Sequence, residues 1–450
     1  MIILIKSIRT WLAYLEGEGK LKTVSKEVDL RFELPGIIKK LDGKSAVKFT
    51  NPRGYSIPVV SGLAFNRSMF AEAIGTTEHN LVKKFRECQK QPLACEVISQ
   101  EEAPVMENVI TDDLDLMKLP IPVHHEKDAG AYITAGLLIA KDQMTGKRNV
   151  SIHRLQVLSK NELGILILPR HLWQFFMHTE QENKALDIAI VIGVDPILLL
   201  ASQAIVPLGV DELEIANALK NGNQKLVKCK TVDIEVPAEA EIVLEGKLLP
   251  NVRKTEGPFG EFPKYYGPAS EKPVIEITAM CYRSKPIYHT ILPATKEHLL
   301  LGGIPREATL YELVSQVVPS VKGVHLTLGG TCRYHAIISI DKKHEGEAKN
   351  AIFAAFSSSQ EIKHVVVVDS DVDIFNMEEV EWAIATRCQF TKDSVIVSGS
   401  LGSKLDPSTN DGISDKIGID ATCPLDAPPE RYERIKIPGF EALDIDNYLD

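Results

Sequence analysis

The pattern of apolar and polar positions changes twice along the chain. In the first hundred residues, helical spacing of apolar side chains predicts helices over Ile8–Glu16 and Met69–Ala73. Short apolar runs predict strands over Ala46–Phe49 and Ile57–Val60. We therefore expect the chain to open with a small α/β domain.

After Pro104 the pattern becomes one of short apolar runs separated by turn residues, which is typical of antiparallel strands. The predicted strands are 131–141, 149–158, 163–168, 226–245 and 274–282. Closure of such a sheet into a barrel would protect its edges. Two helices, over 171–184 and 211–220, are predicted within this region.

From Arg306 onward helices alternate with strands again, which predicts a second α/β unit. The expected helices are 307–317, 346–356 and 377–386, and the expected strands are 324–328, 334–340, 364–369 and 394–397. The fold class is therefore a multidomain α/β and α+β protein. We expect an N-terminal α/β domain (1–112), a central β-barrel domain (113–304) and a C-terminal α/β domain with a tail (305–450).

Composition narrows the function classes. The 450 residues carry a net charge of -10, with 44% hydrophobic and 25% charged residues, which is typical of a globular protein and unfavourable for binding duplex nucleic acid. The longest apolar stretch, Ile188–Ala201, is interrupted by Asp195 and Pro196, so we expect no membrane span. The short apolar N-terminus lacks the features of a signal peptide, and we expect a cytoplasmic protein with reduced thiols among its seven cysteines.

The segment Glu256-Gly-Pro-Phe-Gly-Glu261 places an irregular turn between two carboxylates, and such a turn can direct both into one cavity. A polar surface turn is the alternative. Arg154 shares the alternating face of Val150 and Ile152, so its guanidinium is expected in an apolar environment where it requires carboxylate partners. An arginine between two glutamates can hold one ionised while burial keeps the other protonated as a proton donor.

Asn149, His171 and Glu212 offer oxygen, nitrogen and oxygen ligands, a set that suits Mn²⁺ or Mg²⁺ better than zinc. Glu212 lies on the apolar stripe of its predicted helix and therefore needs a partner. Each residue alone also has an ordinary structural explanation. Strict alternation puts Asn149 and Arg154 on opposite faces of one strand, so a shared site requires a bulge or a strand end between them.

Several catalytic motifs are missing from the sequence. It contains no P-loop, dinucleotide-binding fingerprint, nucleophile elbow or H-E-x-x-H zinc motif, which disfavours the corresponding enzyme classes. Asp369-Ser-Asp-Val-Asp373 begins like a calcium loop, but Ile374 replaces the required glycine. We expect an acidic cluster at a strand end there instead.

Taken together, these segments resemble the UbiD-type decarboxylases, which use prenylated FMN. The resemblance runs over nearly the whole chain and rests on N-V-S-I-H-R at 149–154, the His171 helix start, D-E-L-E-I-A at 211–216, the strand segment 232–246, E-G-P-F-G-E at 256–261, P-I-Y-H-T at 286–290 and D-K-I-G-I-D-A-T at 415–422. It implies a central flavin-binding split β-barrel between the N- and C-terminal domains.

The resemblance also implies residue roles. Arg154, Glu256 and Glu261 match the catalytic Glu-Arg-Glu network, with Glu261 as the proton donor. Asn149, His171 and Glu212 match the ligands of a divalent metal, Mn²⁺ or Mg²⁺, that clamps the flavin phosphate with K⁺ nearby. The other residues at cofactor-contact positions are Ser151, Ile152, His153, Arg170, Ser202, Gln203 and Lys416, where Arg170 stands in place of the Gln of some relatives.

The segment Leu292–Arg306 lacks the G-R-P-P-D-E-P pattern of the enzymes that act on ubiquinone precursors. Its Glu-His-(x)7-Arg arrangement, with Arg333 following, looks like the 2,5-furandicarboxylate decarboxylases and implies that His298, Arg306 and Arg333 bind the carboxylate that is not lost. The archaeal anhydromevalonate phosphate decarboxylases are also similar, and there the cations would take a phosphate. The alternative is that His298 and Arg306 merely begin the next helix.

The predicted function is the reversible, non-oxidative decarboxylation of furan-2,5-dicarboxylate to 2-furoate. Anhydromevalonate phosphate and phenolic or other aromatic acids are alternative substrates, and a metal-dependent hydrolase and a non-catalytic flavin-binding subunit are alternatives of other classes. The expected partners are a small carboxylic acid and a flavin prenyltransferase that supplies the cofactor. We expect a homodimer or a homohexamer built as a trimer of dimers.

Overall fold

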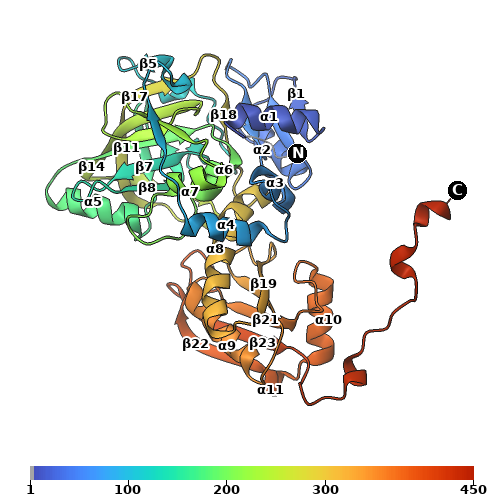
Figure 1. Ribbon diagram of the computed structural model, residues 1–450. Coiled ribbons are helices and arrows are strands. Elements are labelled where there is room, and N and C mark those ends of the chain that lie inside the picture. Colours follow the sequence, from blue (N-terminus) through green and yellow to red (C-terminus); the bar gives the residue numbers. More distant parts are fainter. Residues whose placement is uncertain (1–4, 450) are drawn as a thin grey trace.

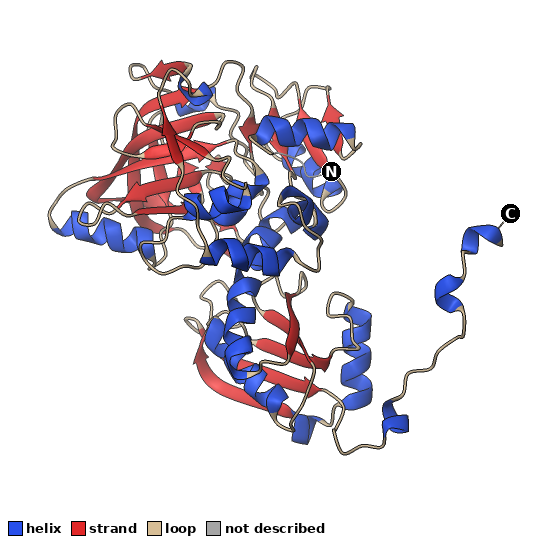
Figure 2. Cartoon of the chain, viewed as in Figure 1, coloured by secondary structure: helices blue, strands red, loops and turns tan. Residues whose placement is uncertain are grey.

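The computed structural model describes residues 5–449. A large curled sheet and the N-terminal elements lie side by side, and the C-terminal domain lies below them, connected by the long helix α8 (Figure 1). Helices cover the outside of the sheets (Figure 2). No helix among the described residues has the length and apolar character needed to span a membrane.

The N-terminal elements surround a small sheet of order β1-β2-β3-β18. Helix α1 begins where the apolar spacing predicts, because Ser7 caps it in a capping box with Thr10, and it buries Trp11. The bounds are α1 (Ile8–Gly17), β1 (Leu21–Val24), α2 (Glu33–Leu41), β2 (Ala46–Phe49), β3 (Val59–Ser61), α3 (Arg67–Ala73), α4 (Leu81–Lys90) and β18 (Tyr288–His289).

The central sheet has nine strands, all paired antiparallel, in the order β6-β9-β10-β17-β14-β11-β7-β8, with β5 added to β17. Its strands are β5 (Asn108–Ile110), β6 (Tyr132–Ile133), β7 (Leu137–Lys141), β8 (Arg148–Ile152), β9 (Leu155–Val157), β10 (Glu162–Ile165), β11 (Leu186–Ile192), β14 (Ile242–Glu256) and β17 (Ser270–Tyr282). The sheet curls into a half-barrel, as the sequence predicts.

Only His153 and Arg154 separate β8 from β9, although these strands lie at opposite ends of the sheet. Three residues of chain span at most about 11 Å, so the two ends of the curled sheet must approach each other at this point. Apolar side chains of the sheet pack on both faces, in two separate hydrophobic clusters. The sheet is therefore an open half-barrel whose two ends approach each other at Arg154.

Smaller elements complete the central region. Helices α5 (His171–Gln181) and α7 (Glu212–Leu219) lie against the sheet, and α6 (Pro196–Ala201) packs against α7 and α8. A separate three-stranded sheet joins β13 (Glu235–Pro237), β12 (Lys225–Lys228) and β4 (Glu96–Ile98). The short strands β15 (Phe259–Gly260) and β16 (Tyr266–Gly267) pair beyond the end of β14.

The C-terminal domain is a five-stranded sheet of order β19-β20-β21-β23-β22 with helices on its faces. Its elements are β19 (Val321–Leu326), β20 (His335–Ile340), α9 (Glu347–Ser358), β21 (His364–Asp369), α10 (Met377–Arg387), α11 (Phe390–Asp393), β22 (Ser394–Leu401) and β23 (Ile413–Ala421). Beyond it the chain continues through the short helices η3 (Pro429–Tyr432), η4 (Phe440–Ala442) and η5 (Ile445–Asn447).

Several elements differ from the sequence-based expectation. Strand β11 was not predicted, the predicted strand 149–158 is divided into β8 and β9, and the predicted strand 226–245 is divided into β12, β13 and the start of β14. Helix α8 (Lys296–Val317) begins at Lys296 rather than at Glu307, although Gly302, Gly303 and Pro305 have poor helix propensity, because burial of this stretch outweighs propensity. Strand β23 was not expected, because it buries the polar residues Ser414 and Lys416 where an apolar run normally marks a strand. The acidic cluster at the end of β21 forms as predicted, with Arg387 paired to Asp369 and Asp371.

The domain division at 112/113 and 304/305 remains a prediction. Strand pairing crosses the 112/113 line twice, since β5 adds to the central sheet and β18 adds to the N-terminal sheet. Helix α8 also runs without interruption through residue 304. These crossings tie the N-terminal elements, the half-barrel and the C-terminal domain into one scaffold.

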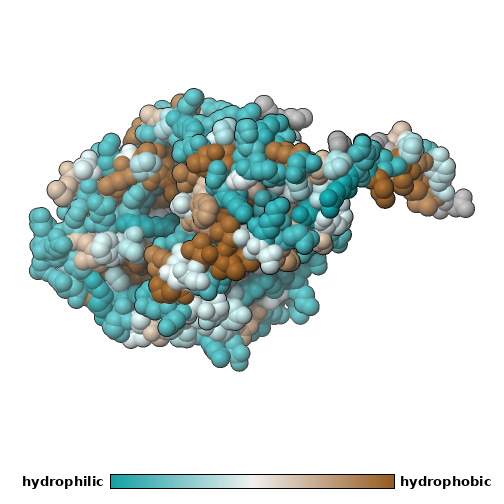
Figure 3. Space-filling model, turned by 90° about the horizontal axis from the view of Figure 1, so that it is seen from below, coloured by the Kyte–Doolittle hydropathy of each residue, from teal (hydrophilic) through white to brown (hydrophobic). Residues whose placement is uncertain are grey.

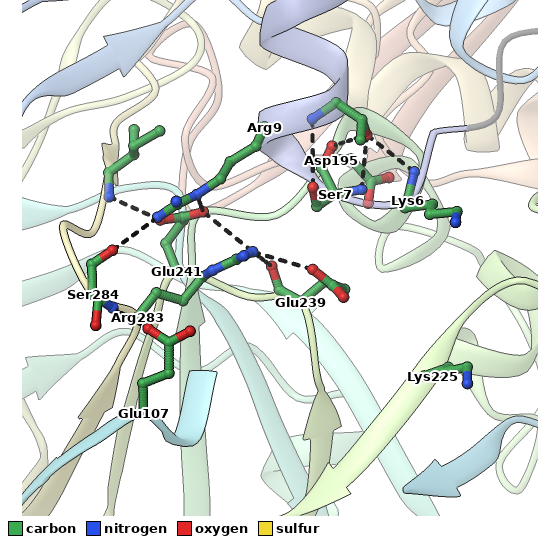
Figure 4. A network of polar contacts seen from close by, with 12 residues as sticks. Lys6, Ser7, Arg9, Glu107, Asp195, Lys225, Glu239, Glu241, Arg283 and Ser284 are labelled. Carbon is green, nitrogen blue, oxygen red and sulfur yellow. Dashed lines mark hydrogen bonds and ion pairs between the residues drawn. The ribbon is translucent and has the colours of Figure 1, made fainter. Parts of the chain in front are cut away.

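An ion pair joins α1 to the central sheet (Figure 4). Glu241 is fully buried and accepts two hydrogen bonds of 2.8 Å from the guanidinium of Arg9. The same carboxylate accepts a hydrogen bond of 3.0 Å from the backbone of Ile287, and Arg283 lies 3.8 Å away. Because a buried carboxylate needs such partners, this contact fixes the position of α1.

We predict that Glu241→Ala lowers the free energy of unfolding by about 2–3 kcal/mol, because it leaves Arg9 and the Ile287 N–H without their acceptor. Urea unfolding followed by the fluorescence of buried Trp11 measures this loss. The matched control is Arg53→Ala, which removes two exposed ion pairs and should lower the free energy of unfolding far less. Equal costs for the two variants would contradict the assignment.

Candidate active site

Arg154 lies in the split of the half-barrel, in the two-residue gap between β8 and β9. The end of β8, rather than a bulge, therefore lies between Asn149 and Arg154. Strict alternation within one strand would place the two side chains on opposite faces, but it does not apply beyond the strand end. The Arg154 side chain is only 9% exposed. Its guanidinium lies over the ring of Phe259, 5.3 Å from the ring centroid, so it is held in a largely apolar environment.

Glu256 and Glu261 approach Arg154 from the two ends of one turn. Glu256 ends β14 and accepts a hydrogen bond of 2.6 Å from Arg154 Nη2, while Arg154 Nη1 donates to Glu261 Oε1. The turn requires Gly257, because its φ is +89° and a Cβ there would lie 3.1 Å from the Pro268 carbonyl oxygen. The structure thus brings together Arg154, Glu256 and Glu261, as the sequence analysis expects.

The two carboxylates have different surroundings. Glu256 is fully buried, and it also accepts a hydrogen bond of 3.1 Å from the hydroxyl of Tyr132. Burial raises the pKa of Glu261, although the charge of Arg154 opposes the shift. Burial disfavours the charged form of Arg154, but the two carboxylates raise its pKa overall. Glu261 therefore keeps its proton to higher pH than an exposed glutamate does.

Three residues that the sequence analysis did not single out hold this network in place. Gln156 accepts from Gly257 N at 2.9 Å and from Tyr132 Oη at 3.0 Å. Asp128 accepts from Gly260 N at 2.8 Å and thereby fixes the turn just before Glu261. Tyr132, Gln156 and Asp128 belong to no motif of the sequence, so no local pattern could have identified them.

Asn149 and Glu212 form a second buried pair. Asn149 Nδ2 donates to Glu212 Oε1 and Val150 N donates to Glu212 Oε2, both at 2.9 Å. Burial raises the pKa of Glu212 to about 8, so its carboxylate requires a nearby positive charge to ionise at neutral pH. His171 begins α5, and among the described residues it makes no hydrogen bond to either side chain.

The remaining predicted cofactor contacts lie around the split and on the C-terminal domain. His153 Nε2 is 2.9 Å from Ser151 Oγ, and its Nδ1 is 3.1 Å from the Leu166 carbonyl. Ile152 ends β8, while Ser202 and Gln203 follow α6. Lys416 lies on β23, where its Nζ donates to the Gln360 carbonyl at 3.0 Å.

Arg306 and Arg333 approach each other at Gly302 on α8. A Cβ added to Gly302 would lie 2.4 Å from Arg333 Nη2 and 3.3 Å from Arg306 Nη1. Arg333 lies over the ring of Phe262, 4.1 Å from its centroid, and Phe262 directly follows Glu261. Phe262 therefore joins Arg333 to the segment that carries Glu261.

The positive charge of this cluster is only partly balanced. Glu361 lies 3.4 Å from Arg306 Nε, and its Oε2 is buried without a hydrogen-bond partner. Burial and the charge of Arg306 lower the pKa of Arg333 to about 10, and burial and both arginines lower the pKa of His298 to about 3. Arg333 is therefore charged at neutral pH, whereas His298 is neutral. Arg170 is exposed at the surface. Its pKa is nevertheless lowered, first by partial desolvation of the guanidinium and second by the charge of Arg306.

Comparison with known proteins identifies relatives along the whole chain. Profiles of the N-terminal, Rift-related and C-terminal domains of 3-octaprenyl-4-hydroxybenzoate carboxy-lyase match residues 12–89, 96–296 and 299–421. The anhydromevalonate phosphate decarboxylase of Methanothermobacter thermautotrophicus is 41% identical over 420 residues, which are 93% of this chain and 97% of the relative. The gallate decarboxylase of Lactiplantibacillus plantarum is 32% identical over 92% of this chain and 94% of its own length.

The solved structure of the UbiD-class enzyme HmfF from Pelotomaculum thermopropionicum in complex with FMN is similar throughout. It shares 59% of its residues with this chain at a TM-score of 0.97 and covers 98% of this chain and 100% of its own. An evolved dimeric form of HmfF in complex with prFMN shares 56% at a TM-score of 0.93, covering 99% and 100%. With three matching domain profiles and full-length relatives, the chain belongs to the UbiD family and is a flavin-dependent carboxy-lyase.

Proposed function

We propose that the protein uses prenylated FMN to decarboxylate furan-2,5-dicarboxylate reversibly to 2-furoate and CO₂. The observation that carries this proposal is the pair Arg306 and Arg333, which meet at Gly302, with Arg333 lying over the ring of Phe262, the residue that follows Glu261. A flat diacid needs two anion sites separated by about the width of a ring. Arg154 provides one of these sites and the two arginines provide the other.

Arginine suits this role because its planar guanidinium can bind a carboxylate through two parallel hydrogen bonds. Among the residues that the structure describes, Arg306 and Arg333 face a single carboxylate, Glu361, at 3.4 Å from Arg306. The cluster therefore keeps an excess of positive charge that an incoming carboxylate neutralises. Neutral His298 adds a hydrogen-bonding group without adding charge.

The residues present fit the proposed cofactor and metal. Arg154 Nε is buried without a hydrogen-bond partner in the described chain and is available to an oxygen of a bound molecule. Asn149, His171 and Glu212 are a hard donor set for Mn²⁺ or Mg²⁺, and the metal would supply the charge that buried Glu212 lacks. Ser151, Ile152, His153, Arg170, Ser202, Gln203 and Lys416 would contact the flavin or its phosphate, with K⁺ nearby.

Prenylated FMN supplies an electron sink for the carbon that loses CO₂. Arg154 holds the scissile carboxylate in place, and Glu256 keeps Arg154 oriented from its buried position. When the C–C bond breaks and CO₂ leaves, Glu261 transfers its proton to the ring carbon. Glu261 then regains a proton from solvent, so one proton is consumed for each CO₂ released.

Two partner assignments belong to the same proposal. A flavin prenyltransferase would supply the cofactor, because this chain is proposed only to bind it. The protein would act as a homodimer or as a homohexamer built from three dimers.

Anhydromevalonate phosphate is the second candidate substrate. The curated relatives at 33–41% identity include several proteins of that name, and the 41% identical one extends over 93% of this chain. Two arginines with one opposing carboxylate suit a phosphate as well as a carboxylate. Incubation of the cofactor-loaded protein with each candidate acid separates the two, with release of CO₂ as the readout. Turnover of the phosphate ester without turnover of the furan diacid would reject the first candidate.

We predict that Glu261→Gln abolishes CO₂ release, by at least about 100-fold in kcat, while the protein still binds flavin. The amide keeps the shape of the side chain but has no acidic proton to transfer. Flavin absorbance after gel filtration measures binding, and CO₂ release measures turnover. Near-normal rates in this variant would show that another group donates the proton.

The pH dependence follows from the same group. The protonated form of Glu261 is the active one, so kcat should fall as the pH rises through the pKa of Glu261. Because burial raises that pKa, the protonated form persists to higher pH than for an exposed glutamate. A rate that increases steadily across this range would be incompatible with an acid role.

We predict that Arg306→Gln raises KM for the furan diacid about 10- to 100-fold, the loss of one charge-assisted contact worth about 1.5–3 kcal/mol. The KM for a monocarboxylate analogue should stay the same, because that molecule does not use the second anion site. Arg253→Gln is the control, since Arg253 pairs with Glu180 on the surface. An equal rise for both acids would contradict the second anion site.

We predict that Glu212→Ala lowers Mn²⁺ content at least about 10-fold relative to the unsubstituted protein. Elemental analysis of protein incubated with Mn²⁺ and then desalted measures the content directly. Glu214→Ala is the matched control, because Glu214 lies on the same helix and makes no contact with Asn149 or Val150. Equal manganese in the two variants would refute the metal assignment.

A further inference from the structure

Glu361 lies in the turn between α9 and β21, beside the two arginines proposed to bind the second carboxylate of the substrate. Its Oε2 lies 3.4 Å from Arg306 Nε and is buried without a hydrogen-bond partner among the described residues. The side chains of Glu361 and Arg306 are only 16% and 13% exposed. A buried carboxylate oxygen without a donor is costly, so the presence of Glu361 at this site requires an explanation.

The turn that carries Glu361 is held by the rest of the C-terminal domain. Lys363 N donates to the Tyr334 carbonyl at 3.0 Å, and Lys416 Nζ donates to the Gln360 carbonyl, also at 3.0 Å. These contacts fix the backbone on both sides of Glu361. Only rotation of its side chain could therefore move the carboxylate away from the arginines.

The two arginines keep most of their donors available. Arg306 Nη1 donates to the Gly302 carbonyl at 2.6 Å, and Arg333 Nη1 donates to the Thr331 carbonyl at 3.2 Å. Within residues 5–449 neither guanidinium donates any other hydrogen bond. Since a guanidinium has five N–H groups, an anion that enters between the two can bind to both.

The charges of this cluster leave a small positive excess. Arg306 and Arg333 contribute two positive charges, and Glu361 contributes one negative charge. His298 adds none at neutral pH, because burial and both arginines lower its pKa to about 3. Arg170 is also near, but it is exposed to solvent, which screens its charge. One carboxylate therefore balances the cluster, whereas a phosphate group, with about 1.5–2 negative charges, leaves it negative.

Burial makes this balance important for binding. The face of the molecule seen in Figure 3 is largely hydrophilic, and solvent screens the charges on such a surface. Arg333, in contrast, is only 8% exposed and lies over the ring of Phe262, 4.1 Å from its centroid. An unbalanced charge at such a place is costly, because little water is present to solvate it.

We propose that Glu361 is a specificity-determining residue, which makes this anion site accept a carboxylate and reject a phosphate. The inference rests on the proposed function, because it takes Arg306 and Arg333 as the site of the carboxylate that is not lost. Hydrogen bonding alone does not separate the two ligands, since guanidinium groups bind both. The fixed charge of Glu361 repels both ligands, and it repels a doubly charged phosphate about twice as strongly as a carboxylate.

The test measures the affinity of the cofactor-loaded protein for inorganic phosphate and for furan-2,5-dicarboxylate by calorimetry at one ionic strength. Glu361→Gln keeps the shape of the side chain and removes its charge, so phosphate affinity should rise at least about 10-fold and by a larger factor than diacid affinity. Glu361→Asp keeps the charge and should retain the low phosphate affinity. The kcat for CO₂ release should stay within about twofold in Glu361→Gln, because the proton donor Glu261 pairs with Arg154 and not with Glu361.

Glu378→Gln is the matched control, because it removes one negative charge from an exposed position at the start of α10. Its affinities should equal those of the unsubstituted protein. The double variant Glu361→Gln/Arg306→Gln should lose the phosphate affinity that Glu361→Gln gains, which assigns the ion to this cluster.

A phosphate affinity that is unchanged or lower in Glu361→Gln, that rises equally in Glu361→Asp, or that persists in the double variant would overturn the proposal. A lower affinity would mean that Glu361 accepts a hydrogen bond from a protonated phosphate. The proposed substrate is tested separately by turnover. A protein that converts no furan diacid but gives the expected phosphate response in all variants would reject that substrate and support the role of Glu361.

Discussion

The approach of the two ends of the central sheet at Arg154 is the constraint on which the site depends. Strand β8 is hydrogen-bonded to β7, and β9 is bonded to β10 and β6, so the backbone on each side of the gap is held by a different edge of the sheet. Arg154 therefore cannot move without disturbing both edges. Support from two edges of the sheet, far more than the local turn, holds the Arg154 side chain in the position that catalysis requires.

Charge is distributed unevenly across the site. Around Arg154 two carboxylates face one guanidinium, whereas around Arg306 and Arg333 one carboxylate faces two. In a water-poor environment such an imbalance acts more strongly than it would in bulk solvent. The first cluster is therefore suited to holding a proton, and the second to attracting an anion. The ring of Phe262 packs against Arg333 in the second cluster.

The sequence predicted most of the architecture, because strand alternation and helix spacing are local properties. It also paired Arg154 with Glu256 and Glu261, since a buried cation needs carboxylates and the E-G-P-F-G-E turn offers two. It did not reveal Asp128, Gln156 or Glu361, because their roles arise from contacts between segments that lie far apart in the chain. The sequence also did not predict β23, because this strand buries polar residues and therefore lacks the apolar pattern that normally marks a strand.

Gly302 has a consequence for how the protein can evolve. Any side chain at this position would collide with Arg333 at 2.4 Å, and a side chain at neighbouring Gly303 would meet Cys332 at 2.7 Å. Single substitutions on this stretch of α8 thus displace the guanidinium group before they can reshape the pocket. Selection for a new acid must instead act on the arginines themselves or on the segments facing the helix. The close packing of one helix against one loop thereby narrows the mutational routes by which the family can diversify at this point.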